Sequence, residues 1–110
     1  MVVDRVTDAE LDRLFQALAD ATRRDIVARV LTGEYSVSAL AAEYAMSFAA
    51  VQKHVAVLER ASLVTKEKRG REQMVRIHLE GLRRARRLLD DYEEIWQQRV
   101  ARIDDILAEG

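Results

Sequence analysis

The amino-acid sequence predicts a mainly α-helical protein with one small β-hairpin and a long C-terminal helix. Apolar residues recur at helical spacing over most of the 110 residues, and the chain has no proline and only four glycines. The spacing changes to strand-like alternation around Gly70 and becomes helical again from Glu80 onward. We therefore expect a single domain over residues 1–110.

The first two helices are predicted by capping residues as well as by spacing. Thr7 lies three residues before Glu10, as in a capping box, and a helix is expected over about residues 8–19. Thr22 and Asp25 have the same spacing ahead of a second apolar stripe. Gly33 is placed to end that second helix.

A helix-turn-helix is predicted at about residues 36–61. Ser36 can cap a short helix, whose buried positions are expected to be Val37, Leu40 and Ala41. A tight connection near residues 45–46 follows, and Ser47 can cap the next helix. The expected buried stripe of this next helix is Phe48, Val51, Val55 and Leu58. Its opposite face carries small and polar residues: Ala49, Ala50, Gln52, Lys53 and Ala56.

The hairpin and the last helix complete the chain. LVTKE and MVRIHL are rich in β-forming residues and flank KRGREQ, which predicts a hairpin over about residues 63–79 with Gly70 at its tip. A helix roughly 40 Å long is expected over residues 80–108, at 1.5 Å per residue. This order of elements is that of a winged helix-turn-helix, in which the hairpin is the wing.

Charge is distributed unevenly along a chain whose formal net charge is -1. Residues 47–79 carry 7 basic and 3 acidic side chains, whereas residues 1–46 carry 5 and 8, and residues 80–110 carry 6 and 8. The only basic third therefore holds the second helix of the helix-turn-helix and the hairpin. This distribution indicates a local contact with a polyanion.

The second helix of the helix-turn-helix has the side chains that a DNA-reading helix needs. Ala49 and Ala50 let the backbone approach base edges, Gln52 can donate to and accept from a base, and Lys53 can reach a base or a phosphate. The Ser47 cap leaves free amides for a phosphate. The wing offers cations for the DNA backbone: Lys66, Lys68, Arg69 and Arg71.

Each of these signals has a simpler explanation when it is taken alone. Small residues in a helix also mark tight helix packing, and a basic turn is usually a solvated loop. Their coincidence in this element order favours DNA binding. The alternative is a winged-helix interaction module whose basic hairpin binds an acidic protein. Such a module would tolerate loss of Gln52 and Lys53 but not of the hairpin charges.

Several function classes are not expected from this composition. There is no cysteine, so thiol chemistry and disulfides are excluded. The two histidines, His54 and His78, lie on different predicted elements, and there is no phosphate-binding glycine loop, so we expect neither an enzyme nor a cofactor. No signal peptide or membrane span is recognisable, which predicts a cytoplasmic protein.

Two segments resemble the ArsR/SmtB family of transcriptional repressors: LFQALADATRRDIVARVL and VSALAAEYAMSFAAVQKHVAVLERASLV. The resemblance covers about residues 11–80. It implies a wing loop at residues 68–72, and it implies that Arg23 and Arg24 include one phosphate contact and one intramolecular pair. The implied major-groove positions are Ser47, Phe48, Ala49, Ala50, Gln52, Lys53 and His54. For His54 we favour a packed ring with one nitrogen on a phosphate or backbone group.

The sequence also departs from that family. Ser36-Val37-Ser38 stands where metal-sensing members have Cys-X-Cys, and the last helix lacks their histidines. The acidic residues of that helix are expected to form a solvated face rather than a hard-cation site: Asp90, Asp91, Glu93 and Glu94. No metal site is therefore expected. Ala45 replaces a frequent glycine, which predicts a turn without a strongly left-handed residue.

The last helix shows more apolar surface than a small domain can cover, which predicts a homodimer. The resemblance implies that the first and last helices of two subunits pack together. The expected interface residues are Leu11, Phe15, Leu88, Tyr92, Ile95, Trp96 and Ile103. Such a dimer would present two recognition helices about 34 Å apart, or a multiple of that spacing, to a pseudo-palindromic operator. No effector is identified by the residues.

Overall fold

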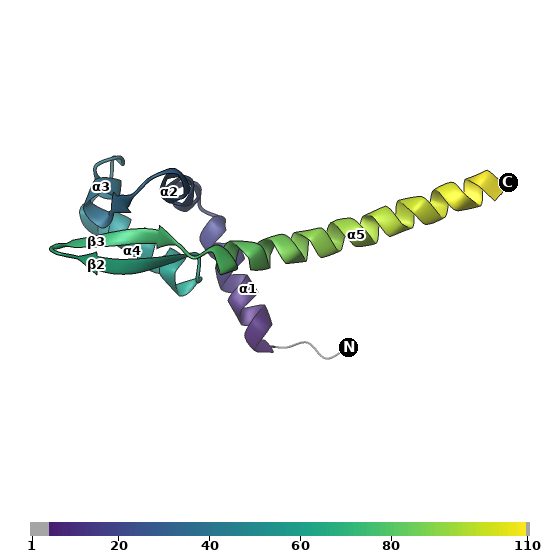
Figure 1. Cartoon of the computed structure of the whole chain (residues 1–110), viewed down its shortest axis with the longest axis horizontal. Helices are drawn as coiled ribbons and strands as arrows, with labels where there is room; N and C mark the ends of the chain where they lie inside the picture. Colours follow the sequence, from purple (N-terminus) through teal and green to yellow (C-terminus); the bar gives the residue numbers. More distant parts are fainter. Residues whose placement is uncertain (1–4, 110) are drawn as a thin grey trace.

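A computed structural model describes residues 5–109 of the chain, and Figure 1 shows the arrangement of its elements. The elements in chain order are α1 (Arg5–Leu18), α2 (Ala21–Thr32), β1 (Tyr35–Ser36), α3 (Val37–Ala41), α4 (Phe48–Arg60), β2 (Val64–Arg69), β3 (Glu72–Ile77) and α5 (Leu79–Glu109). Helices dominate and one hairpin is present, so the predicted mainly α winged-helix class is confirmed.

A head formed by residues 5–85 contains the hydrophobic core. Helix α4 supplies the centre of this core, because Val51, Val55 and Leu58 have no exposed surface. They pack with fully buried side chains of α1, α2, α3 and the loop before the hairpin, which are Leu14, Ile26, Leu40 and Leu63. The helical spacing of the sequence therefore identified this face of α4 correctly at three of its four positions.

The helix caps agree with the sequence at two of the predicted starts. The Oγ atoms of Ser36 and Ser47 accept hydrogen bonds from the amides three residues ahead, at 3.0 and 3.1 Å. The predicted cap of α2 was wrong, because Asp20 accepts from the amide of Arg23 instead of Thr22 capping the helix. Helix α1 starts at Arg5, so Thr7 lies inside it.

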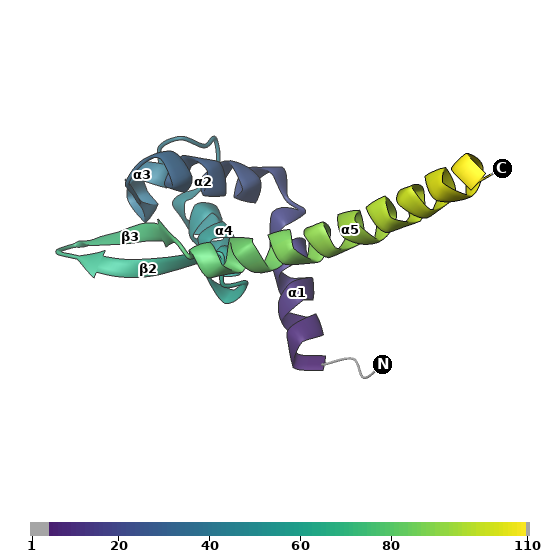
Figure 2. The same cartoon turned by 45° about the vertical axis from the view of Figure 1, so that its right-hand side comes forward.

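The hairpin belongs to a three-stranded antiparallel sheet with the order β1-β3-β2. Strands β2 and β3 pair from Val64↔Ile77 to Arg69↔Glu72, and Gly70 at the tip has a φ of 63°, which favours glycine. Strand β1, which the sequence did not predict, adds two residues to the outer edge of β3. In Figures 1 and 2 the hairpin projects from one end of the head.

The junction between α4, the hairpin and α5 is tightly packed. Ser62, in the turn after α4, has a φ of 60°, and the His78 amide donates to the carbonyl oxygen of Leu63 at 2.9 Å. Gly81, in the first turn of α5, lies so close to this turn that an added Cβ would overlap the Ser62 carbonyl oxygen. Glycine at position 81 therefore allows α5 to start against the head.

Helix α5 leaves the head after its first two turns, and both views show it extending away on the side opposite the hairpin tip. Near its start it crosses α1, where Arg84 and Glu10 form an ion pair at 2.5 Å. From Arg86 to Glu109 none of its side chains is fully buried. The long dimension of the molecule, 69 Å, reflects this projection. Across the described residues, every helix is too short or too polar to cross a membrane.

Candidate nucleic-acid interface

The N-terminal turns of α4 lie at the surface of the head, while the rest of the helix is anchored in the core. Ala49, Gln52 and Lys53 are exposed, and Ala50 is half-buried. Since α4 has 3.6 residues per turn, Ala49 and Lys53 point away from the buried stripe that contains Val51. The predicted separation into one buried and one accessible face therefore holds for these positions.

Phe48 was predicted to join the buried stripe, and this prediction was wrong. Its side chain is 47% exposed, although Val51, Val55 and Leu58 on the same helix are sealed. Phe48 is the first residue of α4, and it lies at the edge of the head beside Val37 and Ser38 of α3. Together with Gln52, Arg71 and Gln73 it lines a groove between α4 and the hairpin.

His54 lies on the side of α4 that faces α1 and α2. Its Nδ1 is 3.3 Å from Nη1 of Arg23 and 3.9 Å from a carboxylate oxygen of Asp20. The ring is thus packed as expected, but its neighbours are side chains and not a backbone group. The Arg23 amide hydrogen bond lowers the pKa of Asp20, and the charges of Arg23 and His54 lower it further.

Arg23 and Arg24 both hold the C-terminal end of α1. Nε of Arg23 donates to the Ala17 carbonyl oxygen at 2.7 Å, and Nη1 of Arg24 donates to that of Leu18 at 2.8 Å. These carbonyls have no partner within α1, so the guanidiniums satisfy a helix end. Both arginines therefore have intramolecular partners, and a phosphate contact by one of them stays a prediction.

Some basic side chains of the hairpin form ion pairs with acidic residues, whereas others have no such partner among the residues that the structure describes. Lys66 pairs with Glu59 at 3.4 Å, and Arg69 lies 3.6 Å from Glu34. Lys68 and Arg71, beside Gly70, are exposed and make no ion pair with any residue between 5 and 109. The tip of the hairpin therefore presents two uncompensated positive charges.

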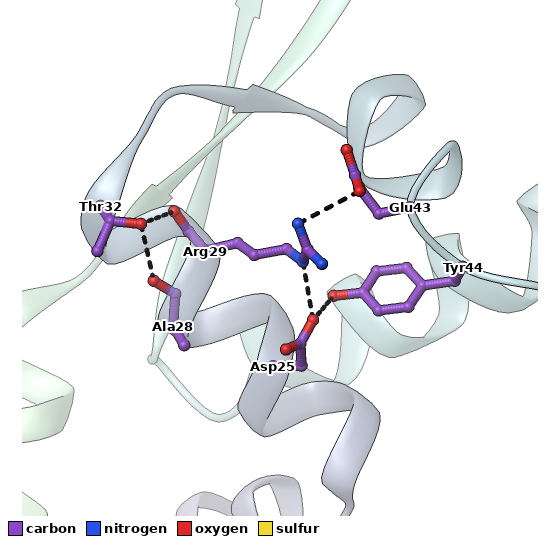
Figure 3. A network of polar contacts seen from close by, with 6 residues as sticks. All are labelled: Asp25, Ala28, Arg29, Thr32, Glu43 and Tyr44. Carbon is purple, nitrogen blue, oxygen red and sulfur yellow. Dashed lines mark hydrogen bonds and ion pairs between the residues drawn. The ribbon is translucent and has the colours of Figure 1, made fainter.

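A polar network that the sequence did not reveal fixes the turn ahead of α4 (Figure 3). The Tyr44 hydroxyl donates to Asp25 at 2.5 Å, and Nε of Arg29 donates to the same carboxylate oxygen at 2.8 Å. Nη1 of Arg29 also pairs with Glu43 at 3.3 Å. The network ties α2 to the segment between α3 and Ser47, and so it helps to set where α4 begins. No local signal links residues 19 positions apart.

This network changes the ionisation of its members. The hydrogen bonds from Tyr44 and Arg29 lower the pKa of Asp25. Burial, followed by the bond to Asp25, raises the pKa of Tyr44 to about 12. Asp25 is thus held as a carboxylate and Tyr44 as a neutral donor at neutral pH. Positive φ among the described non-glycine residues is confined to Ser62, so the turn at Ala45 lacks a left-handed residue, as expected.

The predicted dimer residues form an open surface on α5 and the adjoining face of α1. Leu11, Phe15 and Leu88 are half-buried. Leu11 and Leu88 line one hollow between α1 and α5, and Phe15 packs against the core of the head. Farther along α5 the exposed fractions are 59% for Tyr92, 64% for Ile95, 59% for Trp96 and 45% for Ile103. Val100, Ile106 and Leu107 extend this apolar face. Within residues 5–109 no group of three or more acidic or histidine side chains is placed to hold a metal ion.

Comparisons with known proteins show relatives along most of the chain, although no family model matches it. The HTH-type transcriptional regulator Rv2034 of Mycobacterium tuberculosis is 40% identical over 81 residues, which cover 74% of this chain and 76% of that protein. The solved structure of an ArsR-like transcriptional regulator from Rhodococcus sp. RHA1 superposes with a TM-score of 0.81 and 32% identity. That match covers 98% of this chain and 99% of the Rhodococcus chain.

A solution structure from Mycobacterium bovis adds information on assembly. It is described as the homodimeric winged helix-turn-helix DNA-binding domain of a possible ArsR-family regulator. It matches with a TM-score of 0.67 and 25% identity, over 86% of this chain and 89% of the M. bovis chain.

Proposed function

Because the chain belongs to the ArsR family of winged helix-turn-helix transcriptional regulators, we propose that it is a homodimeric repressor that binds a pseudo-palindromic operator. The observation that carries this proposal is the exposed leading end of α4. There Ala49, Gln52 and Lys53 stand free beside a hairpin tip whose Lys68 and Arg71 are unpaired in the described part of the chain. Such a protein would act on the chromosome, in the cytoplasm.

In this proposal α4 enters the major groove and the hairpin follows the DNA backbone. The Gln52 amide makes a pair of hydrogen bonds to one base, and Lys53 contacts a base or a phosphate. Among residues 5–109 the Ser47 hydroxyl oxygen accepts only from the Ala50 amide, which leaves other amides of the first turn for a phosphate. His54 and Arg23 support α4 from behind, and we assign Lys68, Arg69 and Arg71 to the phosphates. Arg69 has to exchange Glu34 for its phosphate.

The second subunit completes the regulator. The uncovered apolar face of α5 continues onto α1 through Leu88, Leu11 and Phe15, and a two-fold axis along this surface would bury it in both copies. The homodimeric M. bovis relative supports this assembly. The two heads would then address one face of the duplex, about one helical turn apart or a multiple of it. Blocking a promoter in this way needs neither a catalytic group nor a cofactor.

Binding of fluorescent duplexes selected from a random library tests the proposal, with affinity measured over a range of salt concentrations. The wild type should select an inverted repeat. Gln52→Ala should lose about 1–3 kcal/mol of preference for that repeat over other DNA. Lys68→Ala should weaken binding to all duplexes and reduce the slope of log affinity against log salt by about one.

The same experiment separates this function from that of an acidic-protein-binding module. Glu94→Gln, a change on the exposed face of α5 opposite Trp96, serves as the control and should leave both specificity and salt slope unchanged. If no inverted repeat is enriched and Gln52→Ala binds DNA like the wild type, the repressor function is wrong.

A further inference from the structure

Phe48 is a large apolar side chain that the fold leaves only partly buried. Phe48 is 47% exposed at the first position of α4. It borders Val37 and Val55 on the side of the head, but the rest of the groove that it lines is polar or charged: Ser38, Gln52, Lys66, Arg71, Glu72 and Gln73. An apolar side chain gains about 1.5–3 kcal/mol when it is fully buried, and much of that stabilisation is not realised here. A surface contact made by the ring would recover it.

The position of Phe48 determines which partner can reach it. Phe48 and Gln52 are one helical turn apart on α4 and line the same groove toward the hairpin, with the Arg71 side chain on the opposite wall. A partner that touches the ring also meets a side-chain amide and a guanidinium. This combination of one apolar group, one paired donor and acceptor, and one cation complements the edge of a DNA base pair next to its phosphate.

The major groove of DNA offers one apolar feature, the C5-methyl group of thymine, and phenylalanine is among the side chains suited to contact it. Glutamine pairs with the N6 and N7 atoms of adenine in the same groove. We propose that Phe48 is a specificity-determining residue that packs its ring against a thymine methyl group in each operator half-site, while Gln52 reads the neighbouring base. This inference rests on the proposed function and specifies what its recognition helix reads.

The backbone that carries Phe48 is held in place before DNA binds, which favours the proposed contact with thymine. Phe48 follows the Ser47 cap, whose hydroxyl binds the Ala50 amide at 3.1 Å, and Val51 in the next turn is fully buried. The backbone that carries the ring is therefore fixed on both sides. A phenylalanine side chain has only two rotatable bonds, so little conformational freedom is lost when the ring meets the methyl group.

The test removes single methyl groups from DNA. The wild-type protein first selects its duplex from a random library, and each thymine of the selected site is then replaced by deoxyuridine, which lacks only the C5-methyl group. We expect Kd to rise about fourfold at one symmetry-related position and about sixteenfold when both half-sites are changed, as for loss of one buried methyl-sized group each. Other thymines should have little effect.

Substitutions assign this effect to one side chain. Phe48→Ala should bind the thymine and deoxyuridine duplexes with equal affinity, and Phe48→Leu should recover part of the difference. Gln52→Ala should keep the methyl effect while it loses preference at a neighbouring base. Leu79→Ala, which truncates a similarly exposed apolar residue at the start of α5, remote from the first turn of α4, is the matched control and should behave like the wild type. Circular dichroism verifies that each variant is folded.

Two results would overturn the inference. If no deoxyuridine substitution weakens binding, or if Phe48→Ala remains sensitive to the methyl group, the ring does not read thymine. In either case an enriched inverted repeat would still support the proposed function. If the library yields no preferred duplex at all, the proposed function and this inference fail together.

Discussion

Helices α4 and α5 have the same kind of apolar stripe but very different surroundings. On α4 the stripe residues Val51, Val55 and Leu58 are completely buried by the head. On α5 the corresponding residues Tyr92 and Trp96 are 59% exposed, and the helix runs free of the head for most of its length. The apolar spacing of each helix predicts a face that other side chains must bury. Whether residues of the same chain or of a second subunit bury this face depends on the fold.

This difference separates two kinds of stability in one small protein. Loss of an apolar contact on α4 should act on the folding of the head, at any protein concentration. Loss of one on α5 should act on assembly and depend on concentration. The two helices are joined at the junction around Gly81, where the first turn of α5 packs against the turn that follows α4.

The largest effect is expected from Leu58→Ala in the core. Leu58 has no exposed surface, so the substitution removes buried atoms and leaves a cavity that costs about 2–5 kcal/mol of unfolding free energy. Urea denaturation followed by circular dichroism measures it. Lys53→Ala on the exposed face of α4 is the control, with an expected change within about 0.5 kcal/mol. Equal stability of the two variants would contradict the assignment of the core.

The next largest effect is expected from Trp96→Glu on α5, and it should appear in assembly. A buried charge in place of an interface tryptophan should weaken the dimer by at least about 2 kcal/mol, or roughly thirtyfold in Kd. Sedimentation velocity over a range of concentrations measures this shift. Gln98→Glu introduces the same charge on the opposite face of α5 and should leave the dimer intact. A Trp96→Glu protein that sediments like the wild type would rule out this surface as the interface.

A smaller effect is expected from Gly81→Ala, which should destabilise the protein although glycine-to-alanine changes within helices usually stabilise it. In an ordinary helix this change is stabilising by up to about 1 kcal/mol. Here the new Cβ would overlap the Ser62 carbonyl oxygen, so α5 has to shift, and we expect a net loss of about 1–3 kcal/mol. Thermal unfolding gives the sign directly. An increase in Tm would mean that the helix and the turn are not in close contact.

The smallest effect is expected from Asp25→Asn in the network of Figure 3. Its hydrogen bonds lower the pKa of Asp25 below the ordinary value of 3.8. The ionised side chain therefore contributes stability that is fully present above pH 3.8 and is lost as the pH falls through the lower pKa of the folded state. The variant should be slightly less stable at pH 7 and should lose less stability between pH 5 and pH 3. Thermal melts at these pH values test this, with Asp91→Asn on α5 as the exposed control.

Periodic and capping signals predicted the head well because they are local. Ser36, Ser47 and the stripe of α4 each depend on residues within one or two turns. The failures arise where tertiary contacts decide. Strand β1 is only two residues long and exists because β3 has a free edge, and Asp20 displaces Thr22 as a cap at the start of α2. Phe48 fits the spacing of the buried stripe, but it is the first residue of α4 and stays 47% exposed at the edge of the head.

The candidate interface was predicted in part for the same reason. Exposure of Ala49, Gln52 and Lys53 follows from the position of α4 and agrees with the sequence-based expectation. Ion pairing does not follow from the sequence, because Glu34 reaches Arg69 across the sheet and Arg23 reaches back to α1. The assignment of DNA contacts to individual residues remains a prediction that the binding experiments test.

The hairpin is connected directly to α5, and this connection has a mechanical consequence. Only His78 separates the last residue of β3 from the first residue of α5, so no flexible tether absorbs a change in tilt between them. A straight helix of 31 residues is about 46 Å long, and a five-degree pivot at its base displaces the far end by roughly 4 Å. If the far ends of two α5 helices are held together in a dimer, the converse also holds. A small rotation at the dimer contact would then move both DNA-binding heads along the duplex.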